Sequence, residues 1–297
     1  MGLVASLIIP AHNEAGQIET LLEQLRSEVA PNDQVFVIAN GCTDDTAQRA
    51  RAFEYVTVIE QAAPSKILAL NSGDEAAGDN FPRLYLDADI AMQMGSVRAL
   101  IEALNVPEPR VVAPHVSIDV SFSSFLVRSH YYVVSRHPWI VKHASTHLAG
   151  RRIYGANEAA RKRFGLFPTV TNDDGFFDQC YSATERKIVD NTMVFTLARR
   201  TSDEEVGRLV RVRRGNLELE AWFTASGQPR PDRESPIELK GSRLGRIVRM
   251  MATSGFVTRP AALAPAYILG WLIMKRRVTA ATQLLDQRGG AIEWAGK

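Results

Sequence analysis

Short apolar runs alternate with helix-like segments through the first 120 residues, and this alternation constrains the fold more than any other feature of the sequence. The runs are rich in β-branched residues and lie at 3–9, 34–39, 56–60, 83–87 and 110–118. Between them, apolar residues recur every three or four positions, most clearly in 18–29 and 97–104. Such alternation predicts a mostly parallel, Rossmann-like α/β sheet flanked by helices on both faces.

Polar motifs follow three of the apolar runs, at the point where each run ends. They read PAHNE at 10–14, NGCTDDT at 40–46 and DAD at 87–89. Parallel sheets bind their ligands at the carboxyl ends of the strands. We therefore expect the three motifs to meet at one edge of the sheet and to form the binding site there.

The DAD motif places the carboxylates of Asp87 and Asp89 on either side of Ala88. Alternating positions of a strand point the same way, so both carboxylates can face one pocket. Two nearby carboxylates repel each other unless a cation lies between them, and Mg²⁺ and Mn²⁺ prefer oxygen ligands. The motif therefore indicates a divalent metal site, with a solvated turn as the simpler alternative.

The other two motifs combine polar groups with turn and capping residues. Thr43 or Asp44 can cap the helix that follows the second strand. Asn40 stands before that turn, where its amide could read the edge of a nucleobase. In PAHNE, Asn13 is also explained by helix capping, whereas Glu14 is less easily explained by structure alone.

Four segments in order resemble glycosyltransferase family 2, whose members have the GT-A fold. They are PAHNE, ANGCTDDT, a segment with Lys66, Asn71 and Gly73, and LDADI, and the resemblance extends over about residues 5–195. No single segment is specific, but the four in order are. The resemblance implies an inverting enzyme that transfers a sugar from a nucleoside diphosphate with the help of Mg²⁺ or Mn²⁺.

The same resemblance implies which residues bind the donor. They are Pro10, Ala11, Asn13, Glu14, Asn40, Lys66, Asp87, Ala88 and Asp89. Asp89 would bind the metal, and Asp87 would contact the ribose or sugar and is the second candidate ligand. The family pattern has an aspartate where Asn40 stands. A UDP-sugar is the first expectation for the donor, with GDP- and dTDP-sugars as alternatives.

A glycine-containing segment at 154–161 resembles the family's acceptor loop. It supplies three expected acceptor-binding residues, Gly155, Ala156 and Asn157. Glycine allows a backbone to approach a sugar closely. The alternative is a simple helix start, for which Asn157 is a suitable cap.

A second acceptor-side segment at 171–177 carries an acidic pair before an apolar helix. The resemblance implies that its second acid, Asp174, is the general base and that Asp173 helps to bind the acceptor. Asp173 replaces the glutamate that is usual in the family. Capping of the helix by these acids is the structural alternative.

Charge divides the chain into an acidic and a basic part. Residues 1–198 hold 17 Lys and Arg against 23 Asp and Glu, and residues 199–297 hold 18 against 10. We expect a GT-A catalytic domain over 1–198 and a basic, mainly helical extension over 199–297. Arg211 and Arg214 are candidates for a phosphate contact because guanidinium suits phosphate geometry, although a solvated helix face explains either one as well.

Residues 259–277 contain a long apolar run that ends in KRR. Packing on the body or in a homodimer is favoured, and an interfacial helix at an acidic membrane is left open. The uncharged stretch Pro260 to Met274 is too short to span a bilayer. With two cysteines and an N-terminus typical of a first strand, we expect a cytoplasmic protein, with peripheral contact at the inner membrane face left open.

Other classes of protein fit the sequence less well. A nucleotidyltransferase would need a glycine-rich loop with Lys or Arg after the first strand, and a haloacid-type phosphatase would carry its DxD there. A non-catalytic nucleotide-sugar-binding scaffold would be expected to lose Asp89 or Asp174. We expect a carbohydrate, a lipid-linked or a small-molecule acceptor, a role in polysaccharide or glycoconjugate biosynthesis, and no nucleic-acid partner.

Overall fold

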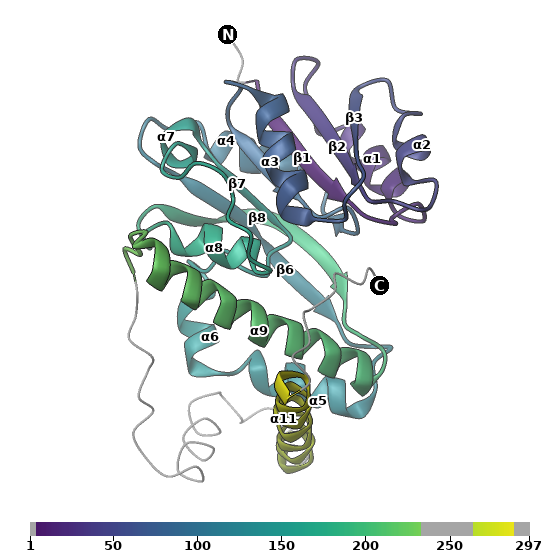
Figure 1. Ribbon diagram of the computed structural model, residues 1–297, viewed down its shortest axis with the longest axis vertical. Coiled ribbons are helices and arrows are strands. Elements are labelled where there is room, and N and C mark those ends of the chain that lie inside the picture. Colours follow the sequence, from purple (N-terminus) through teal and green to yellow (C-terminus); the bar gives the residue numbers. More distant parts are fainter. Residues whose placement is uncertain (1–3, 233–263, 288–297) are drawn as a thin grey trace.

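A single sheet organises the computed structural model, which describes residues 4–232 and 264–287. Within these residues eight strands lie in the order β3-β2-β1-β4-β7-β6-β8-β5 (Figure 1). Their bounds are β1 (Ser6–Ala11), β2 (Gln34–Asn40), β3 (Val56–Gln61), β4 (Arg83–Leu86), β5 (Ala91–Met92), β6 (Val111–Asp119), β7 (Ile153–Ala156) and β8 (Arg186–Leu197).

Helices cover the sheet and extend beyond one end of it (Figure 1). They are α1 (Ile18–Arg26), α2 (Thr46–Ala50), α3 (Lys66–Ala77), α4 (Ser96–Ala103), α5 (Phe125–Val134), α6 (Pro138–His143), α7 (Glu158–Arg161), α8 (Asp173–Gln179), α9 (Ser202–Ser226) and α11 (Ala264–Gln287). The five expected strands correspond to β1, β2, β3, β4 and β6, so the predicted Rossmann-like sheet is confirmed.

The sheet has a parallel half and a mixed half. β3, β2, β1 and β4 run parallel, whereas β7 is antiparallel to both of its neighbours, β4 and β6. β6 and β8 are parallel to each other, and β5 is antiparallel to β8. The parallel half therefore places the carboxyl ends of its four strands at one edge, and β7 enters the sheet from that edge.

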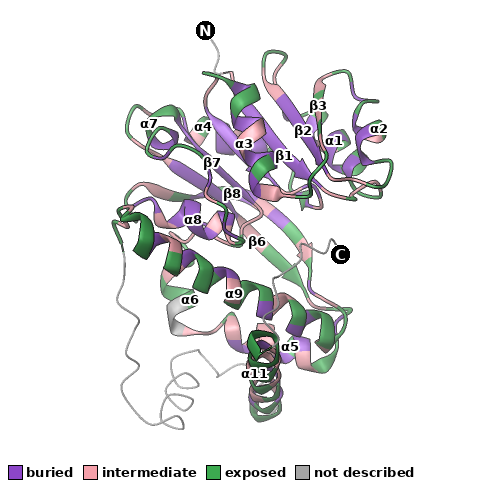
Figure 2. Cartoon of the chain, viewed as in Figure 1, coloured by how far each residue is buried: buried purple, intermediate pink, exposed green. Residues whose placement is uncertain are grey.

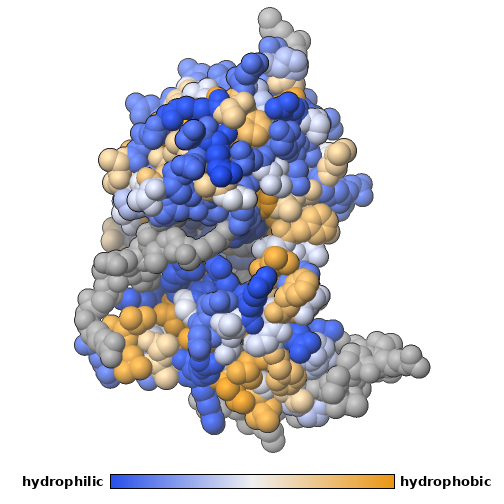
Figure 3. Space-filling model, turned by 90° about the vertical axis from the view of Figure 1, so that its right-hand side faces the viewer, coloured by the Kyte–Doolittle hydropathy of each residue, from blue (hydrophilic) through white to orange (hydrophobic). Residues whose placement is uncertain are grey.

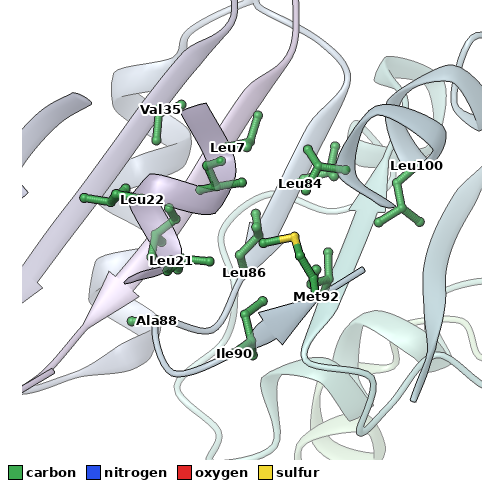
Figure 4. Packing of buried hydrophobic residues seen from close by; sticks show 14 of the residues in the cluster. Leu7, Leu21, Leu22, Val35, Leu84, Leu86, Ala88, Ile90, Met92 and Leu100 are labelled. Carbon is green, nitrogen blue, oxygen red and sulfur yellow. The ribbon is translucent and has the colours of Figure 1, made fainter. Parts of the chain in front are cut away.

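Each face of the sheet has its own hydrophobic cluster because successive residues of a strand point to opposite faces. Leu7 and Ile9 belong to the cluster under α1 and α4, part of which Figure 4 shows. Ile8 belongs to the cluster under α3 and α8. A Cβ at Gly73 would lie 2.4 Å from Cγ2 of Ile8, so glycine lets α3 lie close to β1. Figure 2 shows the strands buried between helices whose outer faces are exposed.

The expected helical extension is confirmed within the described residues. Leu219 and Phe223 of α9 join the cluster under α8, so α9 packs on the same core as the strands. Met274 of α11 packs against Val206 and Val210 of α9. The remaining expected residues of the extension, 233–263 and 288–297, lie outside the described residues. The division at 198 falls between β8 and α9 and stays a prediction.

The described part of segment 259–277 packs on the body. In α11, the Tyr267 ring stacks on Phe125 and Tyr132 of α5, and Arg277 pairs with Asp203 of α9. None of the helices in the described ranges is long and apolar enough to cross a bilayer. Figure 3 shows hydrophobic patches gathered on the lower part of the molecule, where α5, α9 and α11 lie in Figure 1. Homodimer and membrane contacts stay predictions.

Candidate active site

The three polar motifs meet at one sheet edge, as predicted, and the first two are joined by hydrogen bonds. Asn13 Oδ1 accepts the backbone N–H of Thr43 at 2.8 Å. Thr46 Oγ1 accepts the backbone N–H of Glu14 at 2.8 Å, and Asp44 Oδ2 accepts that of Ala15 at 3.1 Å. The loops after β1 and β2 therefore form one structural unit, in which Asp44 also holds the start of α2.

The donor-side residues differ in how far they reach the surface of this edge. Pro10 and Ala11 are buried in β1, whereas Asn13 is exposed and Glu14 is half-buried. Asn13 has a φ of 53°, a left-handed conformation that asparagine tolerates better than most residues. The methyl group of Ala88 is buried in the cluster under α1. Of these five residues, Asn13 and Glu14 have side chains that reach the surface, and donor contacts by Pro10, Ala11 and Ala88 stay predictions.

Asn40, the residue expected to contact the base, lies at the end of β2. Its side chain is fully buried, and Nδ2 donates to the carbonyl of Ala11 at 2.8 Å. Its own carbonyl contacts His12 Nδ1 at 2.7 Å. The amide therefore joins the two strand ends, while its Oδ1 is buried without a hydrogen-bond partner among the described residues. The base contact expected of Asn40 stays a prediction.

The two carboxylates of the DAD motif face the same edge and share their cations. Asp87 Oδ1 lies 2.9 Å from Lys66 Nζ, and Asp87 Oδ2 lies 3.2 Å from Arg152 Nε. Asp89 Oδ1 accepts from Arg152 Nη2. One guanidinium thus contacts both carboxylates, so the two side chains point to the same region of the sheet edge.

The chemistry of this pair fits a hard divalent cation. Asp87 and Asp89 each offer carboxylate oxygens, and their side chains are 23% and 20% exposed, so a ligand from solvent can reach them. The described residues contain no group of three or more His, Cys, Asp and Glu side chains arranged to hold a metal. Two protein carboxylates would therefore leave most of a metal's coordination positions to other ligands.

The acidic pair at the start of α8 is divided between the interior and the site. Asp173 is buried, and its Oδ2 accepts from the Tyr154 hydroxyl at 2.8 Å and lies 3.0 Å from Lys66 Nζ. Burial lowers the pKa of Lys66, but the carboxylates of Asp173 and Asp87 raise it more, so the ammonium stays charged. Asp173 therefore anchors Lys66, and its contact with an acceptor stays a prediction.

Asp174 has the properties expected of a base. Its Oδ2 accepts the backbone N–H of Gly150 at 2.5 Å, and its Oδ1 accepts that of Gly175 at 2.8 Å. Burial and the neighbouring negative charge of Asp173 raise the pKa of Asp174 to about 6, although Lys66 lowers it. A carboxylate with a pKa near the working pH is well suited to accept a proton.

The structure places Gly155, Ala156 and Asn157 away from the DAD motif, and their acceptor contacts stay predictions. In the antiparallel register of β7 and β4, Ala156 lies opposite Arg83, at the end of β4 remote from the DAD motif. A Cβ at Gly155 would lie 2.9 Å from the carbonyl oxygen of Arg83, so this glycine allows close strand packing. Asn157 Oδ1 caps α7 by accepting the N–H of Ala160 at 3.0 Å, so the simpler alternative was right for Asn157.

The segment that does reach the site is 147–152, just before β7, and sequence reasoning missed it. It carries Arg152, which contacts the DAD carboxylates, and Gly150, which contacts Asp174. Asp178 on α8 accepts the N–H of Leu148 at 2.7 Å and contacts His147 at 2.9 Å. In the sequence, two arginines directly before an apolar run were the signal that could have indicated this segment. Which end of the strand faces the site, however, depends on the direction of the strand in the sheet.

Arg211 and Arg214 lie on α9 and are not joined to the sheet edge by any contact within the described residues. Arg214 Nε lies 3.9 Å from Asp286 of α11, so this side chain is turned toward α11. Burial and the neighbouring positive charges of Arg199 and Arg208 lower the pKa of Arg211. Their phosphate contact stays a prediction. Asn216 of α9 supports the site instead. Its Oδ1 accepts from Nδ2 of Asn172, the residue next to the acidic pair, at 2.6 Å.

The sequence of residues 6–207, more than half of the chain, matches the model of Glycosyl transferase family 2. The chain therefore belongs to glycosyltransferase family 2, and the resemblance drawn from its motifs is confirmed. No curated protein sequence matches it.

Solved structures share the fold at low sequence identity. The mannosyltransferase PcManGT from Pyrobaculum calidifontis, in complex with GDP-Man and Mn²⁺, has a TM-score of 0.56 and 16% identity, over 96% of this chain and 79% of that one. Mannosyl-3-phosphoglycerate synthase from Rubrobacter xylanophilus has a TM-score of 0.51 and 16% identity, over 77% of each chain. GalNAc-T7 with UDP, GalNAc and Mn²⁺ has a TM-score of 0.50 and 11% identity, over 67% of this chain and 44% of that one.

Proposed function

We propose that this protein is an inverting glycosyltransferase that moves a sugar from a nucleoside diphosphate to an acceptor hydroxyl, with Mg²⁺ or Mn²⁺. The observation that carries the proposal is the meeting of two acidic pairs, joined by Lys66, which contacts both Asp87 and Asp173. Departure of the diphosphate and removal of the acceptor's proton are separate tasks on opposite faces of the sugar. Two acidic groups held apart by one ammonium are suited to divide those tasks.

Donor binding is proposed at the joined loops after β1 and β2. Asn13 and Glu14 lie at the surface of these loops, and the base and the ribose of the nucleotide would lie beside these two residues. UDP is the first candidate nucleotide, with GDP and dTDP as alternatives. The complexes of PcManGT with GDP-Man and of GalNAc-T7 with UDP support a nucleotide donor and the inclusion of both bases in a screen. The acceptor class stays open among carbohydrates, lipid-linked sugars and small molecules.

Asp87 and Asp89 are the residues that would hold the divalent metal. When bound, the metal stabilises as a Lewis acid the negative charge on the leaving diphosphate. The chain's own contribution is to fix these carboxylates, because Lys66 orients Asp87 and the backbone N–H of Asp87 donates to the carbonyl of Arg152 at 3.0 Å. Mn²⁺ in the complexes of PcManGT and GalNAc-T7 supports the choice of metal.

Asp174 is proposed to take the proton of the acceptor hydroxyl as the new bond forms. Its Oδ2 is oriented by the N–H of Gly150, and its pKa of about 6 leaves it ionised near pH 7. A hydroxyl is a weak nucleophile until a positioned base accepts its proton, and such a base contributes about 10²–10⁴ in rate. The acceptor would therefore lie between Asp174 and the bound sugar.

Thermal unfolding in the presence of UDP-, GDP- and dTDP-sugars, each with and without Mn²⁺, tests the proposal. A donor at a hundred times its Kd should raise the free energy of unfolding by about 2.7 kcal/mol. The free sugars and the nucleoside monophosphates are the matched controls. Transfer to candidate acceptors is then measured with the selected donor, and the anomeric configuration of the product is read by NMR. Stabilisation by none of the donors, or a product of retained configuration, would contradict the proposal.

A further inference from the structure

Arg152 is fastened to the DAD motif through both its side chain and its backbone. Its guanidinium contacts Asp87 Oδ2 at 3.2 Å through Nε and Asp89 Oδ1 through Nη2. Its carbonyl accepts the N–H of Asp87 at 3.0 Å. Its φ is 68°, in the left-handed region that residues other than glycine seldom adopt. A non-glycine residue in such a conformation is typically kept there by its function.

Cations contact both carboxylate oxygens of Asp87 and one of Asp89, although Lys66 is shared with Asp173. Asp87 has Lys66 at Oδ1 and Arg152 at Oδ2, and Asp89 has Arg152 at Oδ1. The Arg152 side chain is 28% exposed, so its ion pairs are partly shielded from water and stronger than those of a free surface. A second cation that binds the same oxygens must therefore displace the guanidinium or suffer its repulsion.

We propose that Arg152 and the divalent metal are alternative partners of Asp87 and Asp89. When the donor is present, its diphosphate binds the guanidinium and leaves the two carboxylates to the metal. Guanidinium binds phosphate oxygens in a bidentate fashion, so the arginine has a good partner only when the donor is present. The metal then binds weakly alone and tightly together with the donor. This coupling is reciprocal, because each ligand raises the affinity of the other by the same factor.

The inference rests on the proposed function for the position of the metal, but it adds a role for a residue outside the family motifs. It also differs from a purely structural role for Arg152. A structural brace would lower the stability of the protein when it is removed and would leave the affinity for the metal the same or weaker. A competing cation would raise the affinity for the metal when it is removed.

The test is titration calorimetry of the full-length chain with Mn²⁺ alone and with Mn²⁺ in the presence of GDP or UDP. We expect Arg152→Gln to bind Mn²⁺ alone about tenfold more tightly than the wild type, since a contacting charge shifts a carboxylate's cation affinity by about one log unit or more. The factor by which the nucleotide improves Mn²⁺ binding should shrink to the same extent. Arg26→Gln is the control and should match the wild type, since Arg26 is an exposed arginine of α1 that pairs with Glu23 and lies over the Phe53 ring.

Two further variants keep the result interpretable. Arg152→Lys retains the charge but cannot span both carboxylates with one planar group, so its affinity for Mn²⁺ alone should lie between those of wild type and Arg152→Gln. It also substitutes for the glutamine variant if that one does not fold. Adding Asp89→Asn to Arg152→Gln should abolish the tighter binding. Mn²⁺ affinity that is unchanged or weaker in Arg152→Gln, or a gain that survives Asp89→Asn, would overturn the inference.

Failure of the inference can be distinguished from failure of the proposed function. If Mn²⁺ binds the wild type with nucleotide, and Asp89→Asn removes that binding while Arg152→Gln changes nothing, only the competition is wrong. If Asp89→Asn leaves Mn²⁺ binding with nucleotide unaffected, the proposed metal site is wrong, and the inference falls with it.

Discussion

The proposed donor side and the proposed acceptor side of the site are built in different ways. The donor side consists of turns at the ends of parallel strands, joined directly to one another, as Asn13 is to Thr43. The acceptor side consists of the segment 147–152 and α8, joined by Asp178 and Asp174. The donor side is fixed by the common direction of the strands in a parallel sheet. The acceptor side depends on contacts between side chains that are distant in sequence. This difference suggests that substitutions on the two sides should affect different steps.

The largest effect is expected at the base. Asp174→Asn keeps the shape of the side chain but cannot accept a proton, so the transfer rate should fall by about 10²–10⁴ while Mn²⁺-dependent donor affinity is retained. A transfer assay beside a donor titration measures both quantities. Asp190→Asn, whose side chain is 93% exposed on β8, is the control and should behave as wild type.

Asp173 offers an internal check on that assignment. Asp173→Asn should reduce the transfer rate less than Asp174→Asn, since Asp173 is buried against Tyr154 and Lys66. Its main effect should be on stability, where the loss of a buried, hydrogen-bonded charge costs on the order of 1–3 kcal/mol. A near wild-type rate in Asp174→Asn, or a greater loss in Asp173→Asn, would mean that the base is misassigned.

On the donor side, Asp89→Ala should abolish the gain in nucleotide affinity that Mn²⁺ produces. The side chain is 20% exposed and its main partner is Arg152, so the fold should survive. Calorimetric titration of UDP or GDP with and without Mn²⁺ measures the gain, and circular dichroism checks the fold. If Mn²⁺ improves nucleotide affinity equally in the variant, the two sides do not divide the work as described.

The pH dependence of transfer should report the acceptor side alone. The pKa of Asp174 is raised to about 6, and in the proposed mechanism the ionised form accepts the proton. The value of kcat/KM should therefore fall about tenfold for each pH unit below 6 and level off above 7, while donor affinity changes less. A rate that rises as the pH falls through 6 would contradict the assignment. The same raised pKa means that folding loses stability as the pH rises through 4 to 6.

The smallest effect is expected from α11, which belongs to neither side. Leu269 and Ile273 are 60% and 41% exposed there, beside Lys275 and Arg276. If this face meets an acidic membrane, the protein should sediment with acidic vesicles, and sedimentation should fall with salt and drop severalfold in a Lys275→Gln, Arg276→Gln double variant. Transfer to a water-soluble acceptor should not change. Equal sedimentation with neutral vesicles, or none with either, would leave α11 as a packing helix only.

The sequence predicted the donor side better than the acceptor side for a physical reason. Apolar runs and the motifs after them specify where parallel strands end, so the meeting of residues 10–14, 40–46 and 87–89 followed from pattern alone. Burial is harder to predict, because a polar residue such as Asn40 looks the same in sequence whether it serves a ligand or the backbone. Gly155 and Ala156 lie away from the DAD motif because β7 is antiparallel to β4, and no local pattern shows the direction in which a strand joins its sheet.

The spacing of Gly150 and Arg152 has a consequence for how this enzyme can change. With one residue between them, they contact Asp174, the proposed base, and the DAD carboxylates, so a single short stretch of backbone sets the position of both. An insertion or deletion there would misalign Asp174 and the DAD carboxylates at once. Variation toward new acceptors, by natural selection or by engineering, is therefore expected to leave 150–152 at constant length.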